Sequence, residues 1–397
     1  MLTPAEADAA IDAAIAPVSQ ELAPLAACAG RILRQPLFAE RDAPPFDRVA
    51  MDGIAFRAGD LARRRFRLAG IQAAGSPALP LESDGDCIEV MTGAILPSGC
   101  DTVVPIEQLQ TADGHAELDS ACRPEPWRHV HRRGADARAG ERLLDAGTRL
   151  GPPELAIAAS AGEARLPVSR APRIALITTG DELVEPGQPI AGHQVRRSNA
   201  YGLGAALTLA GFPPQADLQL PDREDAIAAA LGAALAQNDV LVLSGGVSAG
   251  RFDHVPRVLA SLGVRERFHG IAQRPGRPMW FGTGAAGTAV FALPGNPVSV
   301  LVCLARYVVP ALSGLVGAAR TAVPQVAMAR PYAFEKALTC FLPVLLGYDQ
   351  AGRAIAEPRP TDGSGDFIAL AGTDGFVELP PGPATYPAGL VVPFYRW

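Results

Sequence analysis

Three short runs of aliphatic residues in the second half of the chain predict buried β-strands. Residues 174–177 (Ile-Ala-Leu-Ile), 240–243 (Val-Leu-Val-Leu) and 289–293 (Ala-Val-Phe-Ala-Leu) are apolar at every position. Strands that are apolar on both faces are typical of parallel sheets covered by helices. Segments of helical pattern separate the runs, so residues 171–318 are expected to form a doubly wound α/β domain.

Each of the three runs leads into a different polar or glycine-rich turn. The first is followed by Thr-Thr-Gly-Asp-Glu at 178–182, the second by Ser-Gly-Gly-Val-Ser-Ala-Gly-Arg-Phe-Asp at 244–253, and the third by Pro-Gly-Asn-Pro at 294–297. Open α/β sheets bind ligands beyond the carboxyl ends of their strands. We therefore expect the three turns to meet at one rim of the sheet and to form the functional site.

The rest of the chain predicts three further domains. Thr3 and Glu6 form a capping box around Pro4, and Gly151-Pro152 opens a second helix. Between these helices, residues 46–138 carry short β-rich runs separated by Gly, Pro, Asp and Ser, which indicates a β-rich domain II inserted into domain I (residues 1–45 and 139–170). Short strands resume after the α/β domain III, and predict a β-barrel domain IV over residues 319–397. The predicted fold class is α/β plus β in an elongated multidomain chain.

Composition narrows the classes of function. The net charge of −6 argues against binding of nucleic acid, and the six cysteines form no C-x-x-C pair, which favours reduced thiols in the cytoplasm. The longest apolar stretch, 298–309, contains Arg306 and is shorter than the ~20 residues of a membrane span, so it predicts a buried helix and no membrane association. No secretion leader is visible. Lys336 is the single lysine among 35 cationic residues, which indicates a general bias toward arginine.

An acidic pair is the first candidate for chemistry. Asp181 and Glu182 directly follow a predicted buried strand, so at least one carboxylate is expected to point into the rim. Adjacent acids suit a divalent cation or a general base, and Thr178 and Thr179 add hydroxyl donors. The alternative is a helix cap or a solvated turn.

The other turns suit anions. The glycines at 245 and 246 let backbone N–H groups approach an anion, although the turn matches neither a P-loop nor a dinucleotide motif. Gly-Val-Ser-Ala-Gly at 246–250 matches a hydrolase elbow, but the apolar run stops at residue 243, which places Ser248 too deep in a loop for that role. The Arg-Pro-Gly-Arg turn at 274–277 places two guanidinium groups where they suit phosphate or molybdate oxygens, or else forms a solvated surface turn. Asn296 and Pro297 are locally a helix start.

Taken together, these turns resemble one family: the MoeA-type molybdopterin molybdenumtransferases, which are related to the E domain of gephyrin. The matching stretches occur in family order across nearly the whole chain. They are residues 51–53, 92–94 with Pro97 and Glu107, 133–136, 178–183, 198–199, 244–250 with Asp253, 274–278, 293–297 and 363–365.

The resemblance implies an elongated homodimer of four-domain chains. Asp52, Thr92 and Asp136 of the inserted domain would reach the cleft of the α/β domain, from the partner subunit. The implied activity transfers molybdate onto adenylylated molybdopterin with release of AMP and needs a divalent cation, usually Mg²⁺. A molybdopterin adenylyltransferase and recipient molybdoenzymes are the possible partners.

The resemblance also suggests roles for individual residues. The acidic catalytic set would be Asp181, Glu182, Asp222 and Asp253, with Glu182 as the first choice for the essential acid and Asp181, Glu182 and Asp253 as metal ligands. Gly245, Gly246, Ser248 and Asn296 would hold the terminal phosphate, Arg274 and Arg277 would hold molybdate or the anhydride, and Thr179, Ser244 and Ser364 would complete the binding set. Arg274 and Arg277 stand where the family usually has lysines, Ala135 replaces a common acid and Ile54 a common aromatic residue.

The sequence leaves three alternatives open. The α/β domain alone resembles molybdopterin adenylyltransferases, although the matches at Asp52 and Thr92 lie outside that domain. Tungstate-handling paralogues share the same motifs. The relation to gephyrin also allows a non-catalytic scaffold, against which the acids at 181, 182, 222 and 253 argue.

Overall fold

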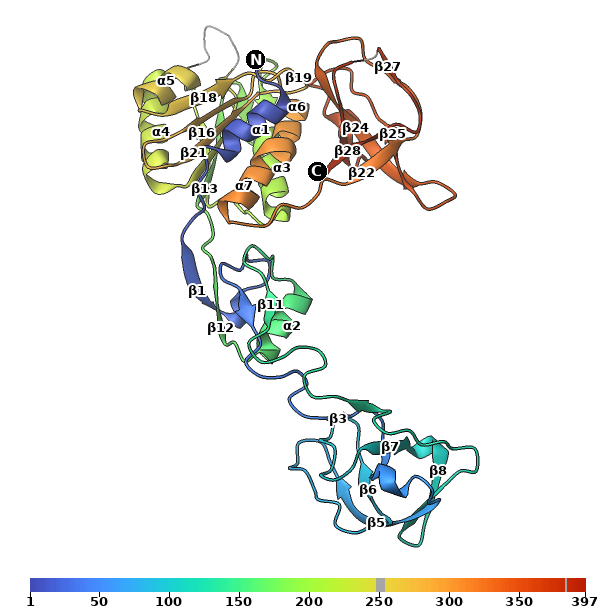
Figure 1. The fold of residues 1–397 in the computed structure, drawn as a ribbon. Helices are drawn as coiled ribbons and strands as arrows, with labels where there is room; N and C mark the ends of the chain where they lie inside the picture. The colour runs from blue at the N-terminus through green and yellow to red at the C-terminus, as the bar shows by residue number, and fades with distance from the viewer. Residues whose placement is uncertain (248–253, 383) are drawn as a thin grey trace.

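The computed structural model describes residues 1–247, 254–382 and 384–397. The molecule is elongated, with the α/β domain and the C-terminal barrel side by side at one end and the inserted β-rich domain at the other (Figure 1). Between them runs an antiparallel ribbon of β1 (Gln20–Pro24) and β12 (Arg165–Ser169), followed by helix α2 (Pro152–Ser160) and the pair β2 (Leu37–Phe38) and β11 (Arg142–Leu144). The elongated multidomain shape therefore agrees with the prediction. The residue limits of the four domains stay predictions.

The α/β domain contains a six-stranded sheet in the order β16-β13-β17-β21-β20-β18. Four of these strands are parallel, the three apolar runs among them as predicted, whereas β20 and β18 are added antiparallel at one edge and make the sheet mixed. The strands are β13 (Ile174–Thr179), β16 (Ala216–Leu220), β17 (Val240–Ser244), β18 (Arg265–His269), β20 (Trp280–Thr283) and β21 (Ala289–Leu293). The three apolar runs form adjacent parallel strands in the middle of the sheet.

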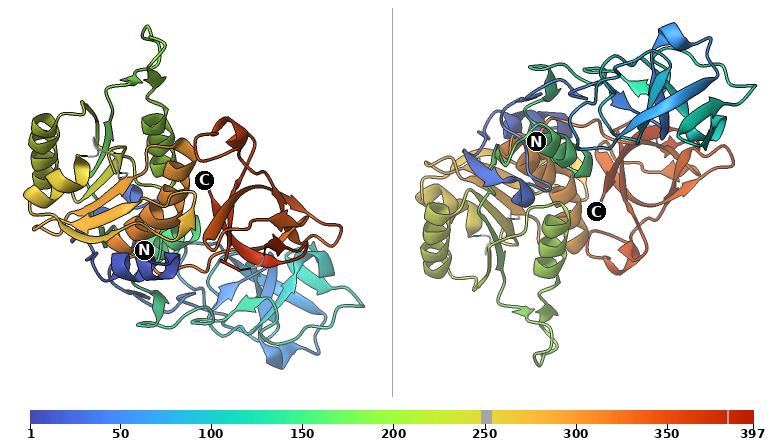
Figure 2. Two further views of the ribbon diagram at one scale, coloured as in Figure 1. Left: turned by 90° about the horizontal axis from the view of Figure 1, so that it is seen from above. Right: turned by 90° about the horizontal axis from the view of Figure 1, so that it is seen from below.

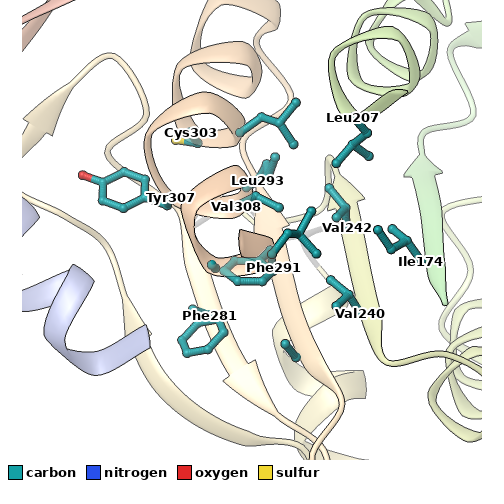
Figure 3. Packing of buried hydrophobic residues seen from close by; sticks show 14 of the residues in the cluster. Ile174, Leu207, Val240, Val242, Phe281, Phe291, Leu293, Cys303, Tyr307 and Val308 are labelled. Atoms are coloured by element: carbon teal, nitrogen blue, oxygen red, sulfur yellow. The ribbon is translucent and has the colours of Figure 1, made fainter. Parts of the chain in front are cut away.

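Helices cover both faces of this sheet. One face packs on α1 (Pro4–Asp12), α3 (Ser198–Leu209), α6 (Pro297–Cys303) and α7 (Val309–Leu315), and Figure 3 shows the side chains of this layer, among them Val242, Phe291 and Val308. The other face packs on α4 (Glu224–Gln237) and α5 (Val255–Ser261). Alternate residues of β13, β17 and β21 enter the two layers, which explains why each run is apolar throughout.

The long apolar segment forms a buried helix, as predicted. Helices α6 and α7 are joined by a π-helical turn, Leu304–Val308, and the window across Pro297–Leu315 is 67% buried inside the protein. By length and composition alone this helix could cross a membrane, but its burial identifies it as a core helix of the α/β domain.

The C-terminal domain is a closed five-stranded barrel. Its order is β24-β25-β22-β28-β26, and β26 pairs again with β24 to complete the ring. The strands are β22 (Gln325–Met328), β24 (Thr339–Tyr348), β25 (Ala354–Pro358), β26 (Gly375–Leu379) and β28 (Val391–Arg396), beside which lies the pair β23 (Tyr332–Ala333) and β27 (Thr385–Tyr386). Both views of Figure 2 show the barrel against the α/β domain. A short strand of the α/β segment, β19 (Gln273–Arg274), pairs in parallel with β24 and ties the two bodies together.

The inserted domain is built on a six-stranded mixed sheet in the order β7-β4-β6-β5-β9-β8. The strands are β4 (Gly53–Phe56), β5 (Arg65–Gln72), β6 (Asp86–Val90), β7 (Thr102–Pro105), β8 (Leu109–Ala112) and β9 (His115–Leu118), with β3 (Arg48–Val49) and β10 (Val130–His131) paired at its base. At Gly53 an added Cβ would lie 2.0 Å from the carbonyl oxygen of Val104, so the close approach of β4 and β7 requires glycine.

Two residues of types that favour helix N-caps do not cap the helices beside them. Helix α3 begins at Ser198, with Arg197 at the N-cap, so Asn199 lies inside the helix instead of capping it. Helix α4 begins at Glu224, with Arg223 at the N-cap, which leaves Asp222 in the preceding loop. Both side chains are available for the site because tertiary contacts, rather than local capping, decide where they point.

Candidate functional site

A cavity of about 1070 Å³ lies where β13, β17 and β21 end. Residues of all three predicted turns line it, together with the arginine turn and two segments of the barrel. In the sheet, Thr178 is level with Ser244, and Ser244 is level with Leu293. The three turns therefore leave the sheet at the same height, and the rim predicted from the apolar runs is present.

The glycine turn forms the floor of the cavity. Gly245 and Gly246 have φ values of +99° and +69°, and a Cβ at Gly246 would lie 2.7 Å from Val255 Cγ2 and 3.1 Å from Thr179 Oγ1. Thr179 is 6% exposed, and its Oγ1 has no hydrogen-bond partner within the described residues. A buried hydroxyl without a partner is costly. Beside two glycines that leave no room for side chains, it indicates a ligand oxygen at this place.

Asparagine side chains hold the turns together. Asn199 Nδ2 donates to Ser244 Oγ over 2.9 Å and to the carbonyl oxygen of Gly295 over 2.7 Å. Asn199 thus joins the first turn of α3 to the ends of β17 and β21. The Asn296 amide donates to Ser364 Oγ of the barrel over 2.6 Å, which brings the Gly-Ser-Gly segment at 363–365 to the cavity.

One end of the site is acidic. The carboxylate of Glu182 lies over Gly180, where a Cβ would come within 2.7 Å of its Oε2. Asp181 Oδ1 accepts a hydrogen bond from the backbone N–H of Asp222 over 3.2 Å. Burial raises the pKa of the Asp222 carboxyl, and the negative charges of Asp181 and Glu182 raise it further. Glu182 and Asp222 line the cavity, whereas Asp181 is exposed and does not line it.

These carboxylates fit a hard cation of the kind that a phosphorylated ligand carries. Within the described residues, no group of three or more His, Cys, Asp and Glu side chains is close enough to hold a metal ion by itself. Mg²⁺ is usually bound by one or two carboxylates together with substrate phosphates. The pKa of Asp222 is raised first by burial and then by the negative charges of Asp181 and Glu182, and a bound cation would relieve the repulsion among these acids.

A buried arginine organises the base of the acidic turn. Arg197 is 5% exposed, and its guanidinium donates to Thr178 Oγ1 over 2.7 Å, to Glu185 Oε1 over 2.8 Å and to Asp217 Oδ2 over 3.1 Å. Two carboxylates neutralise this cation, so it serves to position the turn.

The other end of the site is basic. Arg274, Arg277 and Lys336 line the cavity, and none of them forms an ion pair with another described residue. The turn that carries the arginines is supported from below by Gln273, which is fully buried. Its Nε2 donates to the carbonyl oxygen of Pro275 over 3.1 Å, and its Oε1 accepts from the hydroxyl of Tyr307 on the π-helical turn.

The packing beneath the arginine turn leaves no room for a side chain at Gly276. A Cβ at Gly276, which has a φ of +91°, would lie 2.5 Å from Cys303 Sγ and 2.6 Å from Gln273 Nε2. Burial raises the pKa of the Cys303 thiol, so this cysteine packs as a neutral side chain. The sulfur and the amide therefore fix the height of the turn.

Three predicted site residues lie far from the cavity of the same chain. Asp52 and Thr92 belong to the inserted domain at the other end of the molecule (Figure 1), where Asp52 Oδ1 accepts from the N–H of Thr92 over 2.6 Å and from its hydroxyl over 2.7 Å. The two hydrogen bonds lower the pKa of Asp52, and the one from the backbone N–H of Thr92 has the larger effect. Asp136 contacts His131 Nε2 at 2.8 Å in the same domain. The site of one chain does not include them.

Ten residues of the predicted site line the cavity: Thr179, Glu182, Asp222, Ser244, Gly245, Gly246, Arg274, Arg277, Asn296 and Ser364. Ser248 and Asp253 lie outside the described residues. Sequence reasoning missed Gln273, Lys336 and Phe367 as members of the site. Lys336 carried a signal, because it is the single lysine of the chain; Gln273 and Phe367 carried none.

Comparison with protein families covers almost the whole chain. Residues 2–162 match the MoeA N-terminal region (domain I and II), residues 175–314 match a probable molybdopterin binding domain, and residues 325–397 match the MoeA C-terminal region (domain IV). These matches include the inserted domain with Asp52 and Thr92 as well as the cavity.

Individual relatives are similar over most of their length. A molybdopterin molybdenumtransferase of Synechocystis sp. is 42% identical over 371 residues, which is 93% of this chain and 93% of the relative. One of Bacillus subtilis is 31% identical over 372 residues, 91% of this chain and 86% of the relative. The crystal structure of a molybdopterin biosynthesis moeA protein from Pyrococcus horikoshii OT3 has a TM-score of 0.82 at 26% identity and covers 100% of both chains.

Proposed function

This chain belongs to the MoeA family, and we infer that it is a molybdopterin molybdenumtransferase that inserts molybdate into adenylylated molybdopterin during biosynthesis of the molybdenum cofactor. The observation that carries the inference is the single cavity at the strand ends, in which a glycine floor, a basic end and an acidic end adjoin. A ligand with a phosphoanhydride and an oxyanion co-substrate needs all three.

The glycine floor suits the phosphate of the pterin. Thr179 Oγ1 offers a buried donor, and Gly245 and Gly246 let the ligand approach the backbone to a distance that side chains would forbid. Asn199 fixes the two turns on either side, so little reorganisation accompanies binding. The phosphate is thereby held while the rest of the ligand extends toward the charged ends.

The acidic end suits hydrolysis of the phosphoanhydride. Glu182 lines the cavity, and we propose that it accepts a proton from water as the water oxygen attacks phosphorus. The bond between the attacked phosphorus and the bridging oxygen breaks, and AMP departs. We assign Mg²⁺ to Glu182, Asp181 and Asp222, where it would neutralise phosphate charge; Asp253 stays a further predicted ligand.

The test of this function is a reconstituted reaction with purified protein. Adenylylated molybdopterin, molybdate and Mg²⁺ should give AMP and a cofactor that activates an apo-molybdoenzyme. Omission of molybdate should abolish cofactor formation. Replacing it with tungstate distinguishes a tungstate-handling paralogue, which would turn over faster with tungstate. A protein that binds the pterin but neither releases AMP nor forms cofactor would contradict the proposal and favour a scaffold.

The adenylyltransferase alternative has less support. That interpretation rests on the α/β domain alone, whereas the family matches extend over the inserted and C-terminal domains. An adenylyltransferase would consume ATP and form the adenylylated pterin, so incubation with molybdopterin and ATP separates the two activities.

We further propose that the active form is a homodimer in which the inserted domain of one subunit completes the cavity of the other. Asp52 and Thr92 form a paired, exposed site that the shape of one chain keeps away from its own cavity. Mixing an Asp52→Ala variant with a Glu182→Ala variant tests this arrangement. Mixed dimers should regain one intact site each, and activity should rise to about a quarter of wild type in an equimolar mixture. Absence of recovery in dimers shown to exchange subunits would contradict it.

A further inference from the structure

We propose that Lys336 of the barrel binds the oxyanion substrate and helps to determine its specificity. The proposal rests on the proposed function, because it concerns the oxyanion that the same cavity would receive. Lys336 lines both the main cavity and an adjoining one of about 300 Å³, and Arg274 also lines both. The barrel thus contributes a cation to a site whose other residues come mostly from the α/β domain.

Strand pairing fixes the position of Lys336 relative to the arginine turn. Strand β19 pairs with the start of β24, with Gln273 level with Thr339 and Arg274 level with Cys340. The backbone N–H of Thr339 also donates to the carbonyl oxygen of Ala272 over 3.0 Å. Lys336 lies three residues before Thr339, in a turn closed by a 2.8 Å hydrogen bond from Leu338 N–H to its own carbonyl oxygen. The lysine is therefore anchored beside Arg274 and Arg277 by backbone hydrogen bonds.

The charges at this end favour a doubly charged anion. Among the described residues, Arg274, Arg277 and Lys336 have no ion-pair partner, while Glu182 and Asp222 line the same cavity and Glu335 lines the adjoining one. All three cations are confined to two segments joined by strand pairing. A small dianion would neutralise two of these three positive charges, whereas the carboxylate of Glu335 could neutralise only one.

The chemistry of lysine adds something that arginine does not. A guanidinium group directs its donors in one plane and pairs with two coplanar oxygens, whereas an ammonium group is a compact charge with rotatable donors. Two arginines and one lysine can therefore contact a tetrahedral oxyanion from separate directions. All 34 other cationic residues of the chain, Arg274 and Arg277 of this rim included, are arginine, so Lys336 departs from the arginine bias of the composition.

The single lysine makes the proposal directly testable. An amine-reactive acylating reagent can modify only one side-chain amine in this chain, and peptide mass spectrometry measures the rate at Lys336. Molybdate should slow that modification at least fivefold, with a half-effect near its KM, while chloride at equal ionic strength should not. Lys336→Arg should show no acylation of the corresponding peptide. Unchanged acylation at saturating molybdate would overturn the proposal.

Steady-state kinetics of Lys336 variants provide a second test of the proposal. Lys336→Ala should raise the KM for molybdate about tenfold, as expected for loss of one charge-assisted hydrogen bond, with kcat within about twofold and pterin affinity unchanged. Lys336→Arg should lie between this variant and wild type. Arg353→Ala, which removes an exposed barrel cation paired with Asp349, should change neither constant.

The two arms separate this proposal from the proposed function. A wild-type enzyme that releases AMP and forms cofactor, but whose Lys336→Ala variant keeps the wild-type KM for molybdate, would contradict the role of Lys336 alone. A wild-type protein without transferase activity, in which molybdate still protects Lys336, would support the binding site and contradict the reaction.

Discussion

Asn296 of the α/β domain donates a 2.6 Å hydrogen bond from Nδ2 to the hydroxyl oxygen of Ser364 in the barrel. The backbone N–H of Val298 also donates to the carbonyl oxygen of Ser364 over 3.1 Å. The start of helix α6 is thus joined to the barrel at the wall of the cavity. Asn296 occupies an N-cap position without capping the helix, so its side chain serves the contact between the domains.

Ser364→Ala should weaken substrate binding more than stability. The variant removes the acceptor of the Asn296 amide but keeps the backbone contact with Val298. We expect the KM for the adenylylated pterin to rise about three- to tenfold, as for one lost hydrogen bond, with kcat nearly unchanged. Steady-state kinetics of AMP release measure both. The control is Ser160→Ala, which removes an exposed hydroxyl of helix α2. Equal effects of the two variants would contradict the role.

Glu182→Gln should separate binding from chemistry. The amide keeps the size of the side chain but cannot accept a proton from water, so kcat should fall about 10²- to 10⁴-fold. The Kd for the pterin, measured by fluorescence titration, should stay within about threefold. Glu224→Gln changes a nearby exposed acid that pairs with Arg257 and should keep activity. Full activity of Glu182→Gln would refute the assignment.

Asp222→Asn should stabilise the protein while impairing the site. The folded-state pKa of Asp222 is raised, so the folded protein binds this proton more tightly than the unfolded chain does. Ionisation of Asp222 therefore lowers stability as pH rises from the unfolded pKa through the folded pKa, and the loss is complete above the latter. The Asp222→Asn variant has no carboxyl group to ionise at this position, so its stability does not fall in this way as pH rises.

The corresponding measurement is thermal unfolding as a function of pH without divalent cations. At pH 7 the variant should melt about 1–3 °C higher than wild type, and the difference should vanish toward pH 3. Addition of Mg²⁺ should stabilise wild type more than the variant. A variant that is less stable than wild type at pH 7 would contradict the repulsion among these acids.

Gly246→Ala should destabilise the fold and block phosphate binding. The new Cβ would lie 2.7 Å from Val255 Cγ2 at a φ of +69°, so both strain and a clash oppose it. We expect a loss of about 2–4 kcal/mol in the free energy of unfolding. Gly352→Ala has a similar φ of +76° but open space around it, and should lose only about 1 kcal/mol. Equal losses for both would exclude the clash.

Tyr307→Phe should act on the oxyanion through the arginine turn. It removes the hydroxyl that donates to Gln273 Oε1 beneath Arg274, which should cost about 1–2 kcal/mol of stability and raise the KM for molybdate several-fold. Tyr386→Phe is a matched control, because that tyrosine is equally buried and donates to Pro380 within the barrel. It should lose similar stability without a change in KM. A shared effect on KM would assign the result to general destabilisation.

Part of the site could be predicted because the apolar runs in the sequence show where the buried strands end. The apolar runs ending at Ile177, Leu243 and Leu293 predicted strands of one sheet, and parallel strands bring their turns to one rim. The helix caps were less predictable. Asn199 and Asp222 had the residue types of N-caps, but Asn199 bonds to Ser244 and Gly295 while Asp222 faces two acids. Contacts between residues far apart in the sequence, and not local capping propensity, therefore determine where these two side chains lie.

The sequence by itself determined the buried strands, the glycine turn and the motifs that mark the family, because periodicity and backbone requirements act over a few neighbouring residues. Only the tertiary structure decided that Lys336 stands beside Arg274, that Gln273 is held by Tyr307, and that Asp52 lies at the far end of the molecule. Those relationships depend on pairing of β19 with β24, on burial and on the length of the ribbon between domains. Each of these relationships depends on contacts between residues that are far apart in the sequence, so no local sequence pattern can predict it.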